Sequence, residues 1–225
     1  EFVAIAKKYI SYRDFFDIIN RIILPVGSQG KLGGKAVGLF LAQKILEKEI
    51  EELPILSSVK VPKTWYITTD AITEFLHFNN LEELNEQKYK EIHEIRIEYP
   101  NIVQLMKNSK LPPEIVKSLS VALDDFGDVP LIVRSSSLLE DQVGTAFSGK
   151  YKSLFLSNQG TKKERLEALM DAVIEVYASV FGPDAIQYRA ERNLLDFHEE
   201  MGILIQEVVG TRVGRYFFPL FRSCL

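Results

Sequence analysis

The chain has 225 residues, of which 46% are hydrophobic, and it carries a net charge of −4. This composition is enough for a substantial core, and the acidic balance argues against a general nucleic-acid surface. The single cysteine, Cys224, excludes an internal disulfide, and no apolar run reaches the roughly 20 residues that span a bilayer, so we expect a cytoplasmic protein without membrane contact.

The first part of the chain predicts a helix, a glycine-rich loop and a second helix. Phe15 to Ile23 has the pattern of a short helix that ends before Pro25, and residues 1–26 are expected to form a helical lead-in. The loop after it, GSQGKLGGK, runs into the amphipathic stretch AVGLFLAQKIL. Lys35 would then stand in the first helical turn, where free N–H groups and the helix dipole attract anions. A flexible linker with an incidental lysine is the alternative.

One strand and a series of helices are expected next. Ser57 to Thr68 supplies strand material, and Thr69 or Asp70 can cap the helix that follows. Helical patterns then form a segment at about 81–125, with a break and a new helix start at Pro112.

The stretch from Leu131 to Lys150, LIVRSSSLLEDQVGTAFSGK, concentrates polar chemistry at the end of an apolar strand. Three apolar residues after Pro130 suit a buried strand. Arg134 leaves that strand where its guanidinium can make paired contacts to phosphate oxygens. A salt bridge to Glu140 or Asp141 is the alternative for this arginine.

A second glycine-rich loop follows and combines small hydroxyls with a final lysine: Gly144, Thr145, Ser148, Gly149 and Lys150. Such a backbone can approach an anion closely. The spacing even fits a Walker A loop, but Tyr151 stands where that loop needs Ser or Thr, and YKSLFL predicts a strand. We therefore expect a hairpin whose glycine-rich turn covers phosphates, with an ordinary hairpin turn as the alternative.

The last part of the chain predicts helices and another strand. Thr161 and Glu164 form a capping box, and Arg189, in a later short helix, is expected at the surface. Ile203 to Val209 is mainly apolar and suits a buried strand. Strands mixed with helices, without strict βαβ repetition, predict an α+β or mixed α/β fold.

Several of these stretches occur in an order known from one family. They are LGGKAVGLFLA, VPKTWYITTDAITEFL, VRSSSLLEDQVGTAFSGKYKSLFL, AIQYRAERN and ILIQEVVG. The chain thereby resembles the N-terminal nucleotide-binding domain of phosphoenolpyruvate synthase and pyruvate phosphate dikinase, a group that includes rifampicin phosphotransferase and the glucan, water dikinases. The likeness covers about Gly33 to Gly210. It implies that residues 27–225 form a partial, ATP-grasp-like nucleotide-binding domain with a helical insertion.

The resemblance also implies roles for matching residues. Lys35 matches the lysine that reaches the nucleotide phosphates, Arg134 the arginine that contacts the phosphate being transferred, and Gly144 to Lys150 the family's glycine-rich loop. The hinge that holds adenine falls on Gln206, Glu207 and Val208. Backbone groups of Glu207 and Val208 are expected to read the base, although Gln206 could equally be an ordinary strand residue.

The chain departs from the family pattern in the second loop. Val143, Gly144 and Thr145 precede AFSGK, whereas synthases commonly have proline and aspartate before SFAGQ. Lys150 therefore stands where glutamine is usual, and this extra cation would strengthen phosphate binding or mark a divergent subgroup.

The resemblance implies partners that this sequence does not supply. These are a second lobe whose carboxylates hold Mg2+, a swivelling domain with a phosphocarrier histidine, and a pyruvate-binding domain. None of His77, His93 and His198 has the Thr/Ser-His setting of the carrier, so all three are expected to be structural or surface groups. We expect an ATP-binding fragment of a longer phosphotransferase that is inactive alone. The alternatives are a non-catalytic nucleotide-sensing module and a fragment of another ATP-grasp ligase.

Overall fold

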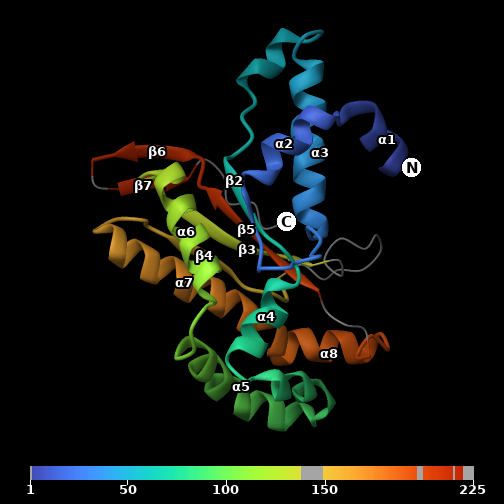
Figure 1. Cartoon of the computed structure of the whole chain (residues 1–225), viewed down its shortest axis with the longest axis vertical. Helices are drawn as coiled ribbons and strands as arrows, with labels where there is room; N and C mark the ends of the chain where they lie inside the picture. The colour runs from blue at the N-terminus through green and yellow to red at the C-terminus, as the bar shows by residue number, and fades with distance from the viewer. Residues whose placement is uncertain (1, 138–148, 197–199, 215, 220–225) are drawn as a thin grey trace.

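The computed structural model describes residues 2–137, 149–196, 200–214 and 216–219. Within them, helices surround a mixed sheet (Figure 1), which confirms the mixed α+β class. The five-stranded sheet has the spatial order β1 (Ile22–Ile23), β2 (Thr64–Ile67), β5 (Met201–Glu207), β3 (Leu131–Ser137) and β4 (Ser153–Leu156). A separate hairpin consists of β6 (Gly210–Val213) and β7 (Tyr216–Pro219).

The helices occupy most of the remaining described chain. The α-helices are α1 (Phe2–Tyr9), α2 (Tyr12–Ile19), α3 (Gly34–Glu49), α4 (Ala71–Phe78), α5 (Ile92–Lys107), α6 (Pro113–Phe126), α7 (Lys162–Ala178) and α8 (Pro183–Glu191). Short 3-10 helices are η1 (Pro54–Ser58), η2 (Glu82–Tyr89) and η4 (Ser179–Phe181). The predicted capping box is confirmed, because the Glu164 N–H donates to Thr161 Oγ1 at 3.3 Å while Glu164 Oε2 accepts from the Thr161 N–H at 2.8 Å.

Two local predictions are wrong. The helix expected to reach Ile23 ends at Ile19, because Ile22 and Ile23 pair in parallel with β2. These β-branched residues gain sheet hydrogen bonds there that a short helix end could not offer. Arg189 is buried rather than exposed, because its guanidinium donates to the Val180 carbonyl at 2.7 Å.

The register of the sheet separates its side chains into two faces. The first, which we call the core face, is covered by α4, α6 and α7 and carries apolar side chains of the main core: Trp65, Ile67, Leu131, Val133, Leu154, Ile203 and Ile205. The second, which we call the open face, carries Thr64, Tyr66, Ile132, Arg134, Ser153, Phe155, Leu204 and Gln206. Since residues that pair across strands point to the same side, these assignments follow from the pairing alone.

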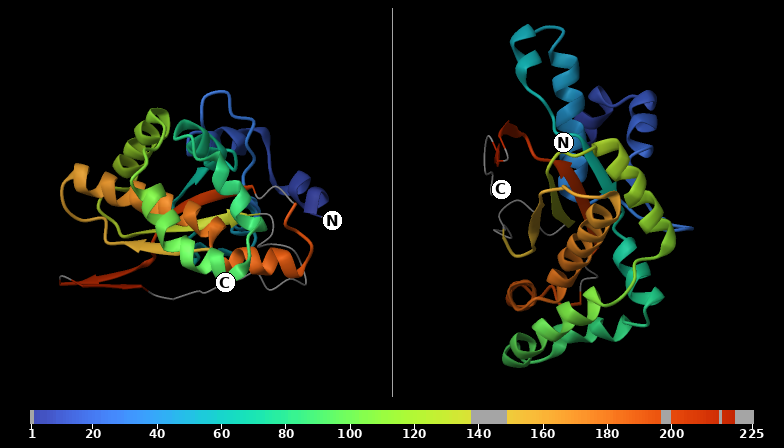
Figure 2. Two further views of the ribbon diagram at one scale, coloured as in Figure 1. Left: turned by 90° about the horizontal axis from the view of Figure 1, so that it is seen from below. Right: turned by 90° about the vertical axis from the view of Figure 1, so that its left-hand side faces the viewer.

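Helix α3 covers only part of the open face. Its Ala36 joins a small apolar cluster with Tyr66 of β2 and Leu204 of β5. Over β3 and β4 the same face is less protected, and Phe155 is 57% exposed. Figure 2 shows α6 and the β6–β7 hairpin on opposite sides of the sheet, with the hairpin on the side of the open face. The fold thus leaves a half-covered sheet surface between α3 and the hairpin.

Candidate functional site

Two glycine- and serine-rich motifs, about 100 residues apart in sequence, meet at the end of β3. The Ala36 N–H in the first turn of α3 donates to Ser136 Oγ at 3.1 Å, and Lys35 Nζ donates to the Ser135 carbonyl at 3.4 Å. Gly33 lies so close that a Cβ there would stand 1.7 Å from the Ser136 carbonyl oxygen. The start of α3 and the end of β3 are therefore in direct backbone contact.

This contact explains why glycine precedes the helix. Gly33 is the N-cap of α3 and has extended backbone angles, φ −65° and ψ 168°, which any residue can adopt. The requirement for glycine is thus steric rather than conformational. Gly33 has no side chain that could cap the helix, and the Ala36 N–H of the first turn donates to Ser136 Oγ instead. The positive end of the helix dipole, with half-buried Lys35, lies at the strand end.

Arg134 lies near this junction on the open face. It pairs in register with Ser153 of β4 and Leu204 of β5, and its side chain is half-buried. Glu140 and Asp141, the carboxylates considered as alternative partners, lie outside the described residues. Lys35 contacts Ser135, the residue after Arg134 in β3, and the first turn of α3 contacts Ser136, so both cations and the helix N-terminus lie around the last residues of β3.

The first glycine-rich loop is held by residues that directly follow β2. Asp70 Oδ2 accepts a hydrogen bond from Ser28 Oγ at 2.6 Å, and Asp70 Oδ1 accepts one from Thr68 Oγ1 at 2.7 Å. A Cβ on Gly30 would lie 2.1 Å from the same carboxylate. The Lys31 N–H in turn donates to Thr69 Oγ1 at 3.3 Å. These contacts fix the path of the chain toward Lys35.

The role of Asp70 differs from the expected one. It occupies the N-cap position of α4, but its side chain makes no capping hydrogen bond because the carboxylate is engaged by Ser28 and Thr68. Burial raises the pKa of the nearby Tyr177 hydroxyl, and the Asp70 carboxylate raises it further. The sequence alone would have indicated this contact only if the TTD segment at residues 68–70 had been linked to the distant GSQG segment at residues 27–30.

The second glycine-rich loop is only partly described. Gly144, Thr145 and Ser148 lie outside the described residues, Gly149 has a positive φ of 79°, and Lys150 is half-buried. The hairpin is confirmed, since β4 pairs antiparallel with β3 from Ser153 to Leu156. Tyr151 is buried in the main core and a strand follows it, as the rejection of a Walker loop required. Phosphate binding by this loop remains a prediction.

The three residues expected to form the adenine hinge lie at the opposite end of the sheet. Gln206 is a buried strand residue whose Nε2 donates to Thr64 Oγ1 at 3.0 Å. The Glu207 N–H donates to the Lys63 carbonyl at 3.0 Å and the Val208 N–H to the Pro130 carbonyl at 2.8 Å. Of the backbone groups of Glu207 and Val208 that were expected to read adenine, both N–H groups are therefore used within the protein. Base reading by these residues remains a prediction.

A cavity of about 540 Å³ opens beside Val208. It lies between the open face and the β6–β7 hairpin, and its lining includes Pro130, Phe155, Arg212 and Tyr216. Four residues of β-strand, or about 13 Å, separate Pro130 from Arg134. The open face thus offers an apolar cavity at one end and a cationic region at the other, an arrangement suited to a molecule with a flat apolar group and a phosphate chain.

The described histidines lie on the surface. His77 of α4 and His93 of α5 are exposed, and His77 Nδ1 lies 2.7 Å from Glu82 Oε1, a contact that raises the pKa of His77. His198 lies outside the described residues. In the described part of the chain, no group of three or more His, Cys, Asp or Glu side chains is placed to hold a metal ion.

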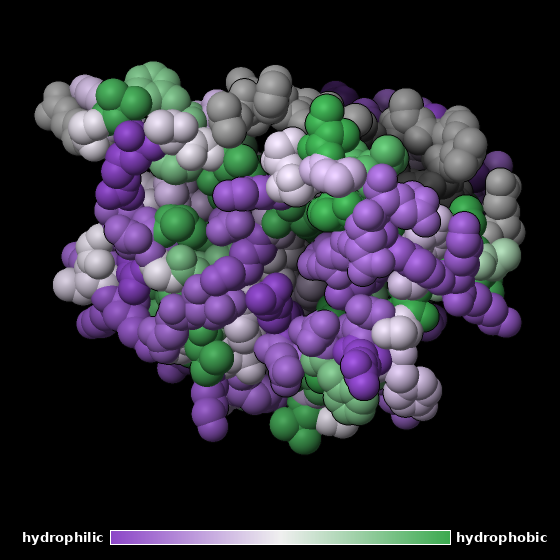
Figure 3. All heavy atoms as spheres, turned by 90° about the horizontal axis from the view of Figure 1, so that it is seen from above, coloured by the Kyte–Doolittle hydropathy of each residue, from purple (hydrophilic) through white to green (hydrophobic). Residues whose placement is uncertain are grey.

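The described helices show no membrane-spanning candidate, since none combines the necessary length with sufficient apolar character. The face in Figure 3, seen from above Figure 1, is mostly hydrophilic, and its hydrophobic side chains form separate patches.

Comparison with known proteins assigns most of this region to one family. A sequence model described as "Pyruvate phosphate dikinase, AMP/ATP-binding domain" matches residues 29–217. The phosphoenolpyruvate synthase of Deinococcus radiodurans is 27% identical over 164 residues, which cover 70% of this chain and 20% of that protein. The probable phosphoenolpyruvate synthase of Methanothermobacter thermautotrophicus is 25% identical over 96% of this chain and 30% of its own length. The rifampicin phosphotransferase of Bacillus subtilis is 23% identical over 74% of this chain and 19% of its own length. The chain therefore spans less than a third of the length of these relatives.

Proposed function

The chain belongs to the pyruvate phosphate dikinase AMP/ATP-binding domain family, and we propose that it is the ATP-binding part of a longer phosphotransferase of the phosphoenolpyruvate synthase kind. In this proposal the described sheet and helices form one lobe of an ATP-grasp-like fold. The nucleotide lies on the open face, with its base toward Val208 and its phosphates toward Lys35 and Arg134.

The observation that carries the proposal is the junction between α3 and β3. The Lys35 ammonium and the N–H groups of the first α3 turn lie at the strand end that follows Arg134. A guanidinium, an ammonium and a helix N-terminus together favour a ligand with several negative charges, and a triphosphate is such a ligand. A single aspartate or glutamate side chain, the alternative ligand, carries only one negative charge and would not require three positive groups.

The proposed chemistry is phosphoryl transfer to a histidine on a domain beyond this chain. An imidazole nitrogen of that histidine forms a bond to phosphorus while the bond to the leaving phosphate oxygen breaks. Lys35 and Arg134 stabilise the charge on the phosphate oxygens during this step, and the glycine-rich loop 144–150 orients them. The phosphohistidine then passes its phosphoryl group to pyruvate or another acceptor.

Magnesium would neutralise part of the phosphate charge when bound. The described residues do not offer a carboxylate cluster for it. We propose, from the family resemblance, that carboxylates of a second lobe of the longer protein hold it.

The proposal is tested by isothermal titration of the protein with a non-hydrolysable ATP analogue. Wild type is expected to bind, and the double variant Lys35→Ala/Arg134→Ala is expected to lose at least tenfold in affinity, since charge-assisted hydrogen bonds contribute about 1.5–3 kcal/mol each. The control is Lys163→Ala/Arg96→Ala, which removes the same charge from the exposed surfaces of α7 and α5. Equal affinity of the two double variants would contradict the site assignment.

A further inference from the structure

The two N-terminal helices lie outside the residues that the family model matches, although the alignment with the Methanothermobacter protein covers 96% of the chain. The family match begins at residue 29, whereas α1 and α2 end at Tyr9 and Ile19. Both helices nevertheless lie beside α3 (Figure 1), the helix that carries Lys35. We call α1 and α2 the lead-in helices. Their contacts with α3 suggest a function that belongs to the nucleotide site.

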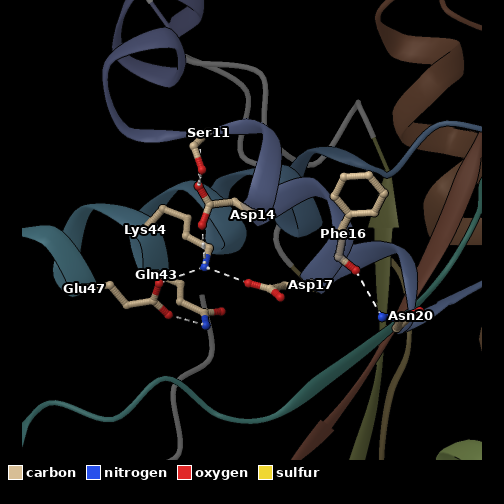
Figure 4. A network of polar contacts seen from close by, with 8 residues as sticks. All are labelled: Ser11, Asp14, Phe16, Asp17, Asn20, Gln43, Lys44 and Glu47. Atoms are coloured by element: carbon tan, nitrogen blue, oxygen red, sulfur yellow. Dashed lines mark hydrogen bonds and ion pairs between the residues drawn. The ribbon is translucent and has the colours of Figure 1, made fainter.

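One such contact is an ion cluster around the buried Lys44 of α3 (Figure 4), in which Asp14 is 19% exposed and Asp17 and Glu47 are exposed. Lys44 Nζ lies 2.9 Å from Asp14 Oδ1 and 3.8 Å from Asp17 Oδ2, both on α2, and 2.8 Å from Glu47 Oε2 on α3 itself. The Lys44 side chain is only 8% exposed. The Ser11 N–H donates to Asp14 Oδ2 at 2.7 Å and so orients the carboxylate toward the lysine. One ammonium thus joins the two helices at a fixed point.

The lead-in helices make further contacts along the same half of α3. Tyr9 Oη donates to Glu49 Oε1 at 3.0 Å, and Lys48 Nζ donates to the Lys8 carbonyl at 3.3 Å. These contacts lie in the last turns of α3, whereas Lys35 lies in its first turn. The helix is therefore held by α1 and α2 at one end and meets the end of β3 at the other.

The apolar attachment of α3 is a small cluster, and the polar contacts of Lys44 add to it. Four buried residues form the cluster between α2, α3 and the open face: Ile18, Ala36, Tyr66 and Leu204. Lys44 follows Lys35 by nine residues, which corresponds to about 13.5 Å along the helix and a rotation of about 180°. Lys35 therefore reaches Ser135 of β3 from the first turn of α3, while Lys44 reaches the carboxylates of α2 from its second half. Ile18 of α2 packs beside Ala36 on the open face, so α2 and the sheet together hold α3.

We propose that the lead-in helices are a positioning element for the nucleotide site, and that Lys44 is the positioning residue through which they hold α3. This inference rests on the proposed function. Removing the Lys44 charge would leave the largely shielded Asp14 carboxylate without its cation, and this would loosen the contact between α2 and α3. The first turn of α3 would then shift relative to β3, and Lys35 would lose its place against the phosphates.

The test combines Lys44→Met with Lys35→Ala in a double-mutant cycle, measured by titration with an ATP analogue and with adenosine. Lys44→Met is expected to weaken binding of the ATP analogue roughly tenfold, the order expected for a disturbed charge-assisted hydrogen bond. Adenosine, which has no phosphates, is expected to bind within about twofold of wild type. In the Lys35→Ala background, Lys44→Met is expected to add less than about twofold, because both changes remove the same contact.

Two further variants complete the experiment. Lys44→Arg keeps the charge and is expected to restore affinity to within about threefold of wild type, while Lys163→Met on α7 is the control for loss of a helix lysine. Asp14→Asn weakens the same cluster from the α2 side and replaces Lys44→Met if that variant does not fold.

The outcomes separate this inference from the proposed function. Unchanged affinity for the ATP analogue in Lys44→Met or Asp14→Asn, equal losses for the ATP analogue and adenosine, or additive effects with Lys35→Ala would each overturn the positioning role. If wild type fails to bind the ATP analogue, or Lys35→Ala binds it as wild type does, the proposed function itself fails.

Discussion

Replacement of Gly33 by alanine tests the junction between α3 and β3 most severely. The added Cβ would lie 1.7 Å from the Ser136 carbonyl oxygen and 2.5 Å from Ser136 Oγ. Strand β3 pairs with both β4 and β5, so it cannot move away from α3 without breaking hydrogen bonds of the sheet. The start of α3 must move instead, which breaks the hydrogen bond from the Ala36 N–H to Ser136.

The expected cost of Gly33→Ala is about 2–4 kcal/mol in the free energy of unfolding. Overpacking contributes about 1–3 kcal/mol and the lost hydrogen bond about 1 kcal/mol. For a chain of this size, this lowers the melting temperature by roughly 5–15 °C. Affinity for an ATP analogue should fall at least tenfold, since Lys35 moves with the helix.

Gly38→Ala in the same helix provides the matched control. An added Cβ at Gly38 meets no atom within 4 Å, and the position is exposed. Because glycine in a helix interior costs about 0.5–1 kcal/mol relative to alanine, this variant should be more stable than wild type by that amount. Thermal unfolding followed by circular dichroism measures both. A Gly33→Ala protein as stable as wild type, with unchanged nucleotide affinity, would refute the close contact.

Three further predictions concern single contacts. Ser136→Ala removes the acceptor for the Ala36 N–H and should lower the free energy of unfolding by about 1 kcal/mol in urea titrations; no change would mean that the hydrogen bond does not form. Thr161→Ala removes the capping box of α7 and should cost about 0.5–2 kcal/mol in the same assay, whereas Thr161→Ser should be nearly neutral. The hydrogen bond from Ser11 and the contact with Lys44 lower the pKa of Asp14 to about 2, so its contribution of about 1 kcal/mol is present above pH 4 and lost as the pH falls toward 2. The free energy of unfolding of Asp14→Asn should therefore change less between pH 4 and pH 2 than that of wild type. The same pH dependence in both proteins would contradict this prediction.

Local patterns predicted the elements of the site correctly. The GGK segment opens a helix, the LIVRSSS run is a strand, and YKSLFL contains its antiparallel partner. Each of these rests on short-range rules, namely glycine before a helix, an apolar run in a central strand and a hairpin around a glycine turn. The family resemblance, confirmed by the match over residues 29–217, then connected segments that local patterns could not.

The sequence could not predict which distant groups satisfy one another. Asp70 suits a helix cap by local rules, yet Ser28, more than 40 residues earlier, engages its carboxylate. Backbone groups of Glu207 and Val208 were expected to read a base, yet Lys63 and Pro130 accept the hydrogen bonds of their two N–H groups. Such outcomes depend on strand order, which composition and periodicity do not encode.

The contacts of the N-terminal helices with α3 could not be predicted from the sequence either. In the sequence, Lys44 is simply a lysine in the amphipathic stretch after Lys35. Asp14 is an acidic residue directly before the helix expected from Phe15. Only the packing of α2 against α3 buries the lysine and brings the carboxylates to it.

We propose that Lys35 and Arg134 belong to one triphosphate site. The most direct measurement is a crystal structure of the protein with Mg2+ and a non-hydrolysable ATP analogue. We expect phosphate oxygens within about 3 Å of both Lys35 Nζ and the Arg134 guanidinium, with the base in the cavity beside Val208. A triphosphate bound away from the junction of α3 and β3, with neither side chain in contact, would contradict the claim.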